Sequence, residues 1–189
     1  LPAAPFRSQY SKPFMELLEA GFGSHLEMDC LCGLIRGHLE RVRRSGSQIP
    51  PKLFEVGTHR GAGICHFHEM APDLEIHSLN VLPGQLAHSP RQMASEIVPR
   101  SEIGRYARER GIPYTQHLSD SRTFDWEGLS RSHRFDIVFI DGCHDQFSVM
   151  ADTLNALRIL QPDGMLIWHD YKVIDEPGRQ VFGAVNDLD

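Results

Sequence analysis

The sequence predicts an α/β fold built on a doubly wound, mostly parallel sheet. From Lys52 onward, short stretches with the composition of strands alternate with stretches that have helical periodicity, and such alternation implies parallel crossover connections. The length of 189 residues is enough for one domain whose core folds unaided. We therefore expect a single domain over residues 1–189, with an arm and helices over 1–51 and the sheet-containing core over 52–189.

Periodicity and composition place the individual elements. Apolar residues recur at steps of three and four from Phe14 to Arg44, with a break at Gly21 and Gly23, which predicts two helices before the sheet. The predicted strands cover residues 52–57, 75–80, 113–118, 135–141 and 165–169. The predicted crossover helices cover residues 61–70, 91–110 with an interruption at Pro99, and 146–160. The last helix carries one apolar stripe, formed by Phe147, Met150, Ala151, Leu154, Leu157 and Leu160.

Composition and charge narrow the class of protein. A hydrophobic content of 41% and a charged content of 23% are ordinary for a soluble globular chain. Apolar runs stay well short of the ~20 residues that a membrane helix needs, and the first residues lack the features of a signal peptide, so we expect a cytoplasmic protein without a membrane partner. The net charge of -6 argues against a nucleic-acid partner. The four cysteines are too few and too unevenly spread for a disulfide scaffold.

A glycine-rich loop follows the first predicted strand, in the segment FEVGTHRGAG at 54–63. In a doubly wound sheet, ligands bind beyond the carboxyl ends of the strands. The spacing of Gly57, Gly61 and Gly63 differs from the dinucleotide fingerprint G-x-G-x-x-G, which cradles a pyrophosphate. A wide loop preceded by Glu55 suits a ligand that carries an ammonium group and no phosphate. The other interpretation is a turn that lets the helix pack closely on the strand.

Acids and histidines follow the fourth and fifth predicted strands. Asp141 and His144 come after the fourth strand, and His169 and Asp170 come after the fifth, so we expect them to converge at one edge of the sheet. Two carboxylates so placed repel each other unless a cation lies between them, and Mg²⁺ is the natural choice. A nitrogen ligand from His169 favours Mn²⁺ or Fe²⁺ instead. The structural alternative is that these residues only form a turn and cap the next helix.

Taken together, these segments resemble class I S-adenosylmethionine-dependent methyltransferases. Within that superfamily the sequence is most similar to the branch with macrolide and aminocoumarin sugar O-methyltransferases and cephalosporin hydroxylase-like proteins. The resemblance depends on FEVGTHRGAG at 54–63, SDSRTFDW at 119–126, FDIVFIDGCHD at 135–145 and LQPDGMLIWHDY at 160–171. It covers about two thirds of the chain and implies a Rossmann-like methyltransferase fold.

The resemblance also implies roles for individual residues. The implied cofactor-binding residues are Glu55, Gly57, Thr58, Gly61, Asn80, Asp120, Ser121 and Asp141. Asn80 stands where most relatives have an acid that holds the ribose hydroxyls, and an amide makes a weaker hydrogen bond there than a carboxylate. In the similar sugar O-methyltransferases, two acids hold a metal that binds neighbouring substrate hydroxyls, and a histidine removes a proton. The resemblance thus implies His144 as the catalytic base and, as metal ligands, Asp141, His169 and Asp170.

The function expected from this resemblance is metal-assisted O-methylation of a small hydroxylated molecule, a sugar or a secondary metabolite. The cofactors are S-adenosylmethionine and a divalent metal, Mg²⁺ before Mn²⁺ or Fe²⁺. Two other functions stay open: a non-haem iron hydroxylase of the same fold, and a non-catalytic binding or assembly module. The strand hairpin that closes the sheet in this superfamily does not appear in the sequence up to FGAVNDLD, so we expect either a fragment of a longer chain or an abbreviated fold. We therefore expect an exposed sheet edge, which a homo-oligomer can cover.

Overall fold

The sheet of the computed structural model is parallel throughout and has the order β3-β2-β1-β4-β5. The structure describes residues 25–44, 46, 48–85, 97–171 and 176–188. The strands are β1 (Lys52–Val56), β2 (Glu75–Asn80), β3 (Thr115–Leu118), β4 (Phe135–Ile140) and β5 (Leu160–Trp168). The chain builds the sheet outward from β1 to β3 and then returns to the other side of β1. The doubly wound fold predicted from the sequence is confirmed, and its switch point lies between β1 and β4.

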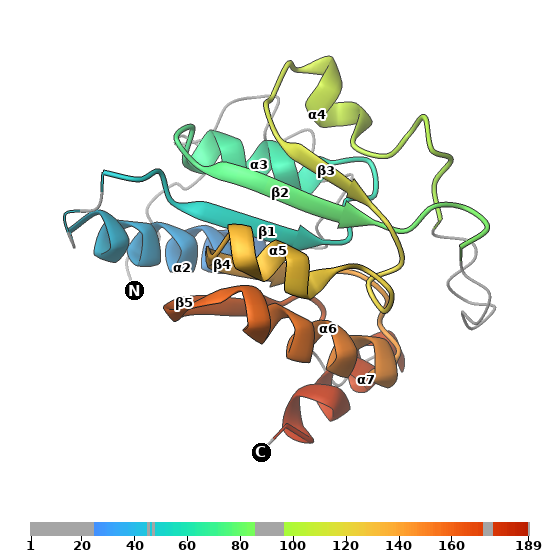
Figure 1. The fold of residues 1–189 in the computed structure, drawn as a ribbon. Coiled ribbons are helices and arrows are strands. Elements are labelled where there is room, and N and C mark those ends of the chain that lie inside the picture. The colour runs from blue at the N-terminus through green and yellow to red at the C-terminus, as the bar shows by residue number, and fades with distance from the viewer. Residues whose placement is uncertain (1–24, 45, 47, 86–96, 172–175, 189) are drawn as a thin grey trace.

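Helices cover both faces of the sheet (Figure 1). They are α2 (His25–Arg44), α3 (Ala62–Met70), α4 (Arg105–Glu109), α5 (Trp126–Ser132), α6 (Gln146–Ile159) and α7 (Glu176–Asn186). Helices α2 and α3 pack on one face, α5 and α6 pack on the other, and α7 packs against α6. Within the described residues, no helix has the length and apolar character required to cross a membrane.

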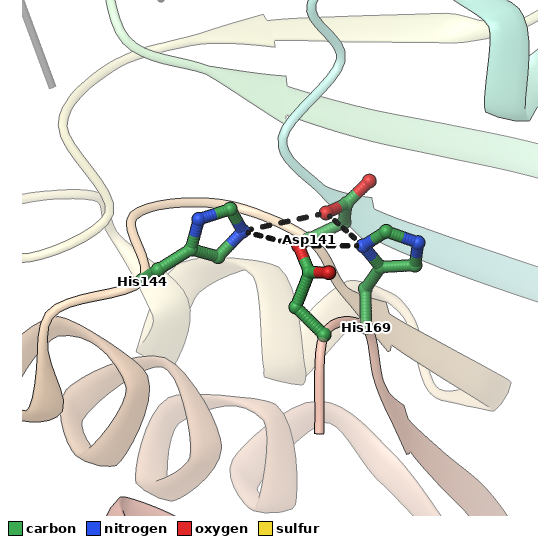
Figure 2. A group of neighbouring side chains, drawn as sticks. Asp141, His144 and His169 are labelled. Carbon is green, nitrogen blue, oxygen red and sulfur yellow. Dashed lines mark ion pairs between the residues drawn. The ribbon is translucent and has the colours of Figure 1, made fainter. Parts of the chain in front are cut away.

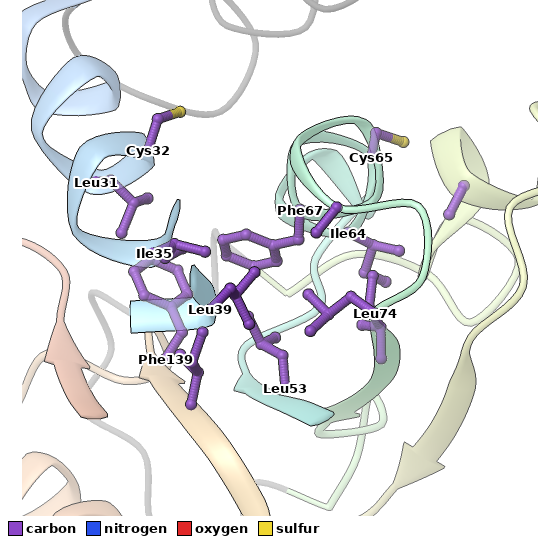
Figure 3. Packing of buried hydrophobic residues seen from close by; sticks show 14 residues of the cluster. Leu31, Cys32, Ile35, Leu39, Leu53, Ile64, Cys65, Phe67, Leu74 and Phe139 are labelled. Carbon is purple, nitrogen blue, oxygen red and sulfur yellow. The ribbon is translucent and has the colours of Figure 1, made fainter. Parts of the chain in front are cut away.

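Two apolar clusters form the core, one on each face of the sheet. Figure 3 shows the cluster beneath α2 and α3, where Ile35 and Leu39 meet Leu53 and Phe67. On the other face, Phe54 packs with the residues of α5 and α6. The adjacent residues Leu53 and Phe54 of β1 thus point to opposite faces of the sheet, and both are buried. This is expected because helices cover both faces of a parallel sheet. Each fully buried side chain of this size contributes about 1.5–3 kcal/mol to stability.

Side-chain caps fix where two helices of the second face begin. The Asp145 carboxylate accepts a hydrogen bond from the Ser148 backbone N–H, at 3.1 Å, in the first turn of α6. Asp125 accepts one from the Gly128 N–H at 2.8 Å in α5. Such caps contribute about 1 kcal/mol each. The sequence analysis missed α5, because seven residues with a glycine among them give no readable helical stripe.

Three sequence predictions need correction. The predicted helix over 91–110 is limited to α4 in its described part, because residues 97–104 are not helical and Gly104 adopts a left-handed conformation (φ 66°). Strand β5 begins five residues earlier than predicted, since Leu160 pairs with Phe135 before the register shifts and resumes at Met165. The first of the two predicted N-terminal helices and residues 91–96 lie outside the described residues.

The third correction concerns α6. The apolar stripe predicted from its sequence does not pack on the sheet, because Phe147 is 87% exposed and Leu154 and Leu157 are each 54% exposed. The helix instead buries a mixed face, whose members are Ser148, Val149, Asp152, Thr153, Ala156 and Ile159. Polar groups on that face have partners: the Thr153 hydroxyl, for example, accepts a hydrogen bond from Trp168 Nε1 at 2.9 Å. Periodicity alone therefore gave the wrong face.

Candidate functional site

The loops that follow β1 and β4 touch through their backbones at the switch point. Gly57 has a φ of 106°, and a Cβ at this position would lie 2.0 Å from the Asp141 carbonyl oxygen. The Asp141 N–H donates to the Val56 carbonyl at 2.8 Å, which holds the two loops together. Only glycine satisfies both the left-handed conformation and the close approach. The residues predicted to hold the cofactor and the metal are thus brought to one edge of the sheet.

Protein contacts account for the other two glycines of the loop as well. A Cβ at Gly61 would lie 2.9 Å from Gly104 Cα, and one at Gly63 would lie 2.1 Å from Glu55 Oε1. The glycines at these positions therefore allow α3 and the segment before α4 to pack closely. This agrees with the second interpretation of the loop, a turn that lets the helix pack on the strand. A role of Gly57 and Gly61 beside a cofactor stays a prediction.

Glu55 is a buried acid at the centre of a polar network below this loop. Its side chain is on the α3 face of β1, and the residue is 2% exposed. The Ser78 hydroxyl donates to Glu55 Oε2 at 2.5 Å and lies 2.7 Å from the Thr58 hydroxyl. Gln116 Nε2 donates to Thr58 Oγ1 at 2.9 Å. Burial raises the pKa of Glu55 to about 8, although the Ser78 hydrogen bond opposes that rise.

We expect the substitution Glu55→Gln to stabilise the fold at neutral and alkaline pH. The folded-state pKa of about 8 exceeds the ordinary value of 4.5, so the stability that Glu55 contributes is complete below about pH 4.5 and is lost as the pH rises through about 8. Glutamine keeps an acceptor for Ser78 but cannot ionise. The difference in unfolding free energy between variant and wild type, measured in urea, should grow up to about pH 8 and then level off.

The same variant should bind S-adenosylhomocysteine roughly 10- to 100-fold more weakly, because an ammonium group bound nearby would favour the ionised form of Glu55, which glutamine cannot adopt. Serine-to-alanine substitution at Ser78 is the matched control, since it alters the same network and keeps the carboxylate. A stability difference that does not vary with pH would show that Glu55 ionises normally. Unchanged affinity would show that Glu55 is not the ammonium partner.

Asn80 holds the glycine loop in place. Its Oδ1 accepts a hydrogen bond from the His59 N–H at 2.8 Å, and its Nδ2 donates to the Val81 carbonyl at 2.8 Å. His59 has a φ of 44°, an uncommon value for a residue other than glycine. An acid at this position could accept from His59 but could not donate to Val81. The departure from the acid of most relatives therefore has a structural use, while contact with a ribose stays a prediction.

Asp120 and Ser121 lie at the carboxyl end of β3, as the fold requires. The Arg122 guanidinium and its backbone N–H donate to the Asp120 carboxylate, and they hold its pKa below the usual value. Trp126 Nε1 donates to the Ser121 carbonyl at 2.6 Å. These contacts give the segment a defined shape, and the predicted role near adenine is a prediction still.

The two acids and two histidines after β4 and β5 form one cluster. Figure 2 shows the imidazoles of His144 and His169 on either side of Asp141. His169 Nδ1 lies 3.0 Å from Asp141 Oδ1 and 3.1 Å from Asp170 Oδ2. His144 Nε2 lies 3.2 Å from Asp170 Oδ2 and 3.8 Å from Asp141 Oδ1. The convergence predicted from the sequence is therefore present.

Local backbone geometry turns these groups toward one another. The His169 N–H donates to the Ile140 carbonyl at 2.9 Å, which extends the β4–β5 pairing to the edge of the sheet. Asp170 then adopts a left-handed conformation with a φ of 57°, which aspartate tolerates better than most residues. This change of direction after the strand brings its carboxylate back beside His144.

In this cluster, the positive charge of His169 offsets part of the negative charge of the two carboxylates. Burial alone would lower the pKa of His169, but hydrogen bonds that its ring donates to the carboxylates of Asp141 and Asp170 raise the pKa to about 10. Burial would likewise raise the pKa of Asp141, and the hydrogen bonds of His144 and His169 keep it below the usual value. The His169 imidazolium is thus itself a cation between two carboxylates. A divalent cation at this place would compete with that proton, so its affinity depends on pH.

The donor set fits a divalent metal. One ligand atom from each of the four side chains lies within 4.8 Å of all the others. Carboxylate oxygens suit Mg²⁺ or Mn²⁺, and imidazole nitrogens shift the preference toward Mn²⁺, Fe²⁺ or Zn²⁺. The three residues predicted as ligands and the predicted base thus share one site, and their separate roles stay predictions.

The sequence analysis missed three polar residues that support the site, two of them buried and one half-buried. Ser78 and Gln116 complete the network beneath Glu55, and Asp152 lies in α6, 1% exposed. Burial raises the pKa of Asp152 to about 7, and a hydrogen bond from Ser121 opposes the rise. The sequence gives one signal for such residues: each is a polar residue at a position where the periodicity of the strand or helix predicts burial.

Comparisons with known proteins agree with this geometry. The family model described as a methyltransferase domain matches residues 54–171, more than half of the chain. A search of curated protein sequences finds no match. Fold and family match together define the class, the class I S-adenosylmethionine-dependent methyltransferases. The chain belongs to the methyltransferase domain family.

Solved structures resemble the fold over most of its length. A proposed caffeoyl-CoA O-methyltransferase from Staphylococcus aureus has a TM-score of 0.62 and 16% identity, covering 96% of this chain and 81% of that one. A methyltransferase from Podospora anserina, bound to S-adenosylhomocysteine, has a TM-score of 0.60 and 14% identity, covering 95% and 79%. An O-methyltransferase from Bacillus cereus, in complex with the same ligand, has a TM-score of 0.58 and 16% identity, covering 95% and 79%. At these identities the likeness supports the fold.

Proposed function

We propose that the protein is a metal-assisted O-methyltransferase that acts on a small molecule with neighbouring hydroxyl groups, a sugar or a secondary metabolite. The observation that carries this proposal is the cluster of Asp141, His144, His169 and Asp170, whose ligand atoms lie within 4.8 Å of one another. It borders the glycine loop, because Gly57 is in backbone contact with Asp141. Methyl donor and acceptor would therefore meet at the switch point of the sheet.

Each half of the site has a separate task. The loop from Gly57 to Gly61 borders the methionine end of the cofactor, and the Glu55 carboxylate below it favours an ammonium group. Asp141, His169 and Asp170 would hold the metal and, through it, orient the hydroxyls of the acceptor. When bound, S-adenosylmethionine supplies a methyl group on a sulfonium, and a divalent cation lowers the pKa of an acceptor hydroxyl. When the methyl group and the acceptor oxygen are held in line, this positioning accounts for a large part of the rate enhancement.

His144 is the group that would accept the hydroxyl proton. Its Nε2 lies 3.2 Å from Asp170 Oδ2, and the side chain is 20% exposed. A base of this kind contributes about 10²- to 10⁴-fold to the rate. Asp170 orients the ring and stabilises its charged form after the proton has moved.

The first test is ligand binding by the full chain. S-adenosylhomocysteine at about 100 times its dissociation constant should stabilise the fold by ~2.7 kcal/mol, seen as a rise in melting temperature that follows ligand concentration. Adenosine alone, which lacks the ammonium group, is the matched control and should act more weakly. A melting temperature that stays constant up to millimolar ligand would favour the non-catalytic module.

One observation also favours a second function, a non-haem iron hydroxylase of the same fold. Two histidines and one carboxylate form the usual facial triad for Fe²⁺, and His144, His169 and Asp141 supply that set. The two functions differ in their co-substrates. Product formation that needs oxygen and Fe²⁺ but no S-adenosylmethionine would support the hydroxylase, and methyl transfer under nitrogen would support the methyltransferase.

A further inference from the structure

A second group of histidines lies far from the candidate active site, at the amino-terminal edge of the sheet. Glu75 and His77 are the first and third residues of β2, and His133 directly follows α5. Because α5 runs back from the carboxyl edge of the sheet (Figure 1), its last residues return to the edge where β2 begins. Glu75, His77 and His133 therefore meet on the sheet face that α5 and α6 cover.

These three side chains are close enough to share an ion. His77 Nε2 lies 3.1 Å from Glu75 Oε1, and the His77 and His133 rings are 4.9 Å apart between centroids. One ligand atom from each residue lies within 4.8 Å of the other two. His77 is 4% exposed, and its ring is held edge-on against Phe135 at 5.1 Å. The core thus fixes the His77 ring, while Glu75 and His133 approach it from half-buried positions.

A third imidazole supports His77 from behind. His117 Nε2 lies 3.2 Å from His77 Nδ1, on the side of the ring opposite to Glu75. The His117 ring itself rests on Phe54 and Phe124, with centroids 5.7 Å and 5.2 Å away. When His117 accepts the Nδ1 proton, the lone pair of His77 lies on Nε2, which faces Glu75 and His133. Metal-binding histidines commonly have such a partner on their second nitrogen.

We propose that Glu75, His77 and His133 bind a transition-metal ion of the Zn²⁺ class, with His117 as a positioning residue. Two imidazole nitrogens and one carboxylate oxygen are an established donor set for zinc, with a fourth position left to water. The ion would tie the start of β2 to the connection between α5 and β4, two segments that are far apart in sequence. The proposal does not depend on methyl transfer, because the site shares no residue with the cluster around Asp141.

Lys52 forms an ion pair with Glu75, one of the proposed metal ligands, and this contact provides a further test. Its Nζ lies 3.0 Å from the Glu75 carboxylate, so the ammonium group and the metal compete for the same acid. Replacing Lys52 with methionine keeps the length of the side chain and removes the competing charge. This variant should therefore bind the metal more tightly than the wild type, by about 10-fold, the factor that corresponds to 1.4 kcal/mol.

The test uses the full chain with the substitutions Asp141→Asn and His169→Gln, which leave the other cluster only one imidazole and one carboxylate, after removal of metals with a chelator. Titration with Zn²⁺ by calorimetry should give one equivalent, and Co²⁺ should give a visible absorption spectrum of tetrahedral type. Adding His133→Gln should abolish both signals. Uptake that is the same with and without His133→Gln, or no uptake at all, would overturn the proposal.

A structural role of the histidines is distinguished by two further measurements. His117→Phe keeps the ring stacking on Phe54 and should weaken Zn²⁺ binding by about 10- to 100-fold while leaving stoichiometry unchanged. The melting temperature in chelator should be the same with and without His133→Gln, and only the protein with His133 should gain stability from Zn²⁺. Loss of stability in chelator without any change in Zn²⁺ affinity would contradict metal binding.

Discussion

Replacing Gly57 with alanine is expected to separate the carboxyl ends of β1 and β4 and to destroy cofactor binding. The new Cβ would lie 2.0 Å from the Asp141 carbonyl oxygen, in a residue whose φ of 106° already disfavours any side chain. Backbone strain costs about 1–3 kcal/mol and overpacking about as much again, so the unfolding free energy should fall by about 2–6 kcal/mol. Urea denaturation measures the fall, and calorimetry with S-adenosylhomocysteine measures the loss of binding.

Gly111→Ala is the matched control for this substitution. Gly111 also has a positive φ, of 63°, but no described atom lies within 4 Å of its ideal Cβ position. It should lose only the conformational part, about 1–2 kcal/mol, and keep its affinity for S-adenosylhomocysteine. Equal losses in the two variants would mean that the contact between the loops carries no energy, contrary to the geometry described above.

Replacing Asp141 with asparagine should abolish metal-dependent methyl transfer while sparing the cofactor half of the site. The change keeps the volume of the side chain but removes the charge that faces His169 and His144. We expect the rate to fall by about 10²- to 10⁴-fold, because neither the metal nor the base would then be held in place. Binding of Mn²⁺ should weaken in parallel, whereas affinity for S-adenosylhomocysteine should change by less than about 3-fold, or ~0.7 kcal/mol.

Asp145→Asn serves as the control, since it makes the same chemical change four residues along the chain. Asparagine is as good a cap as aspartate, so α6 should keep its first turn and the enzyme its rate. Full activity of Asp141→Asn in the presence of a chelator would remove the metal from the proposed mechanism. A large loss of affinity for S-adenosylhomocysteine would instead place Asp141 in the cofactor site, as the sequence resemblance implied.

The parts of the fold that sequence reasoning predicted correctly are those buried on both sides. β1, β2 and β4 lie in the middle of the sheet or next to it, so their apolar character is nearly continuous and gives a strong signal. The cluster around Asp141 followed from the same knowledge, because parallel strands end at a common edge. Strand ends in a parallel sheet are thus predictable as a group once the strands themselves are known.

The features that sequence reasoning missed depend on contacts between distant segments. The register of β5 is shifted at a bulge that no local sequence pattern indicates. The α6 face toward the sheet carries Ser148, which donates to the Asp145 cap, and Asp152, which is hydrogen-bonded to Ser121 from the loop after β3. The same holds for Gln116, whose amide reaches Thr58 across the sheet. Hydrophobic periodicity predicts which positions of an element are buried when those positions are apolar. It cannot identify a polar residue that is buried because its side chain has a hydrogen-bond partner.

The cluster around Asp141 lies entirely within one β-α-β unit, residues 135–170, whereas the glycine loop and Glu55 belong to an earlier one. Under the proposed function, a change of metal preference, or its loss, would therefore need substitutions in a single contiguous segment of the gene. The donor-binding half can stay under constant selection while the other half drifts toward new acceptors. Exchange of that one segment between related chains is accordingly a direct route to hybrid enzymes with altered chemistry.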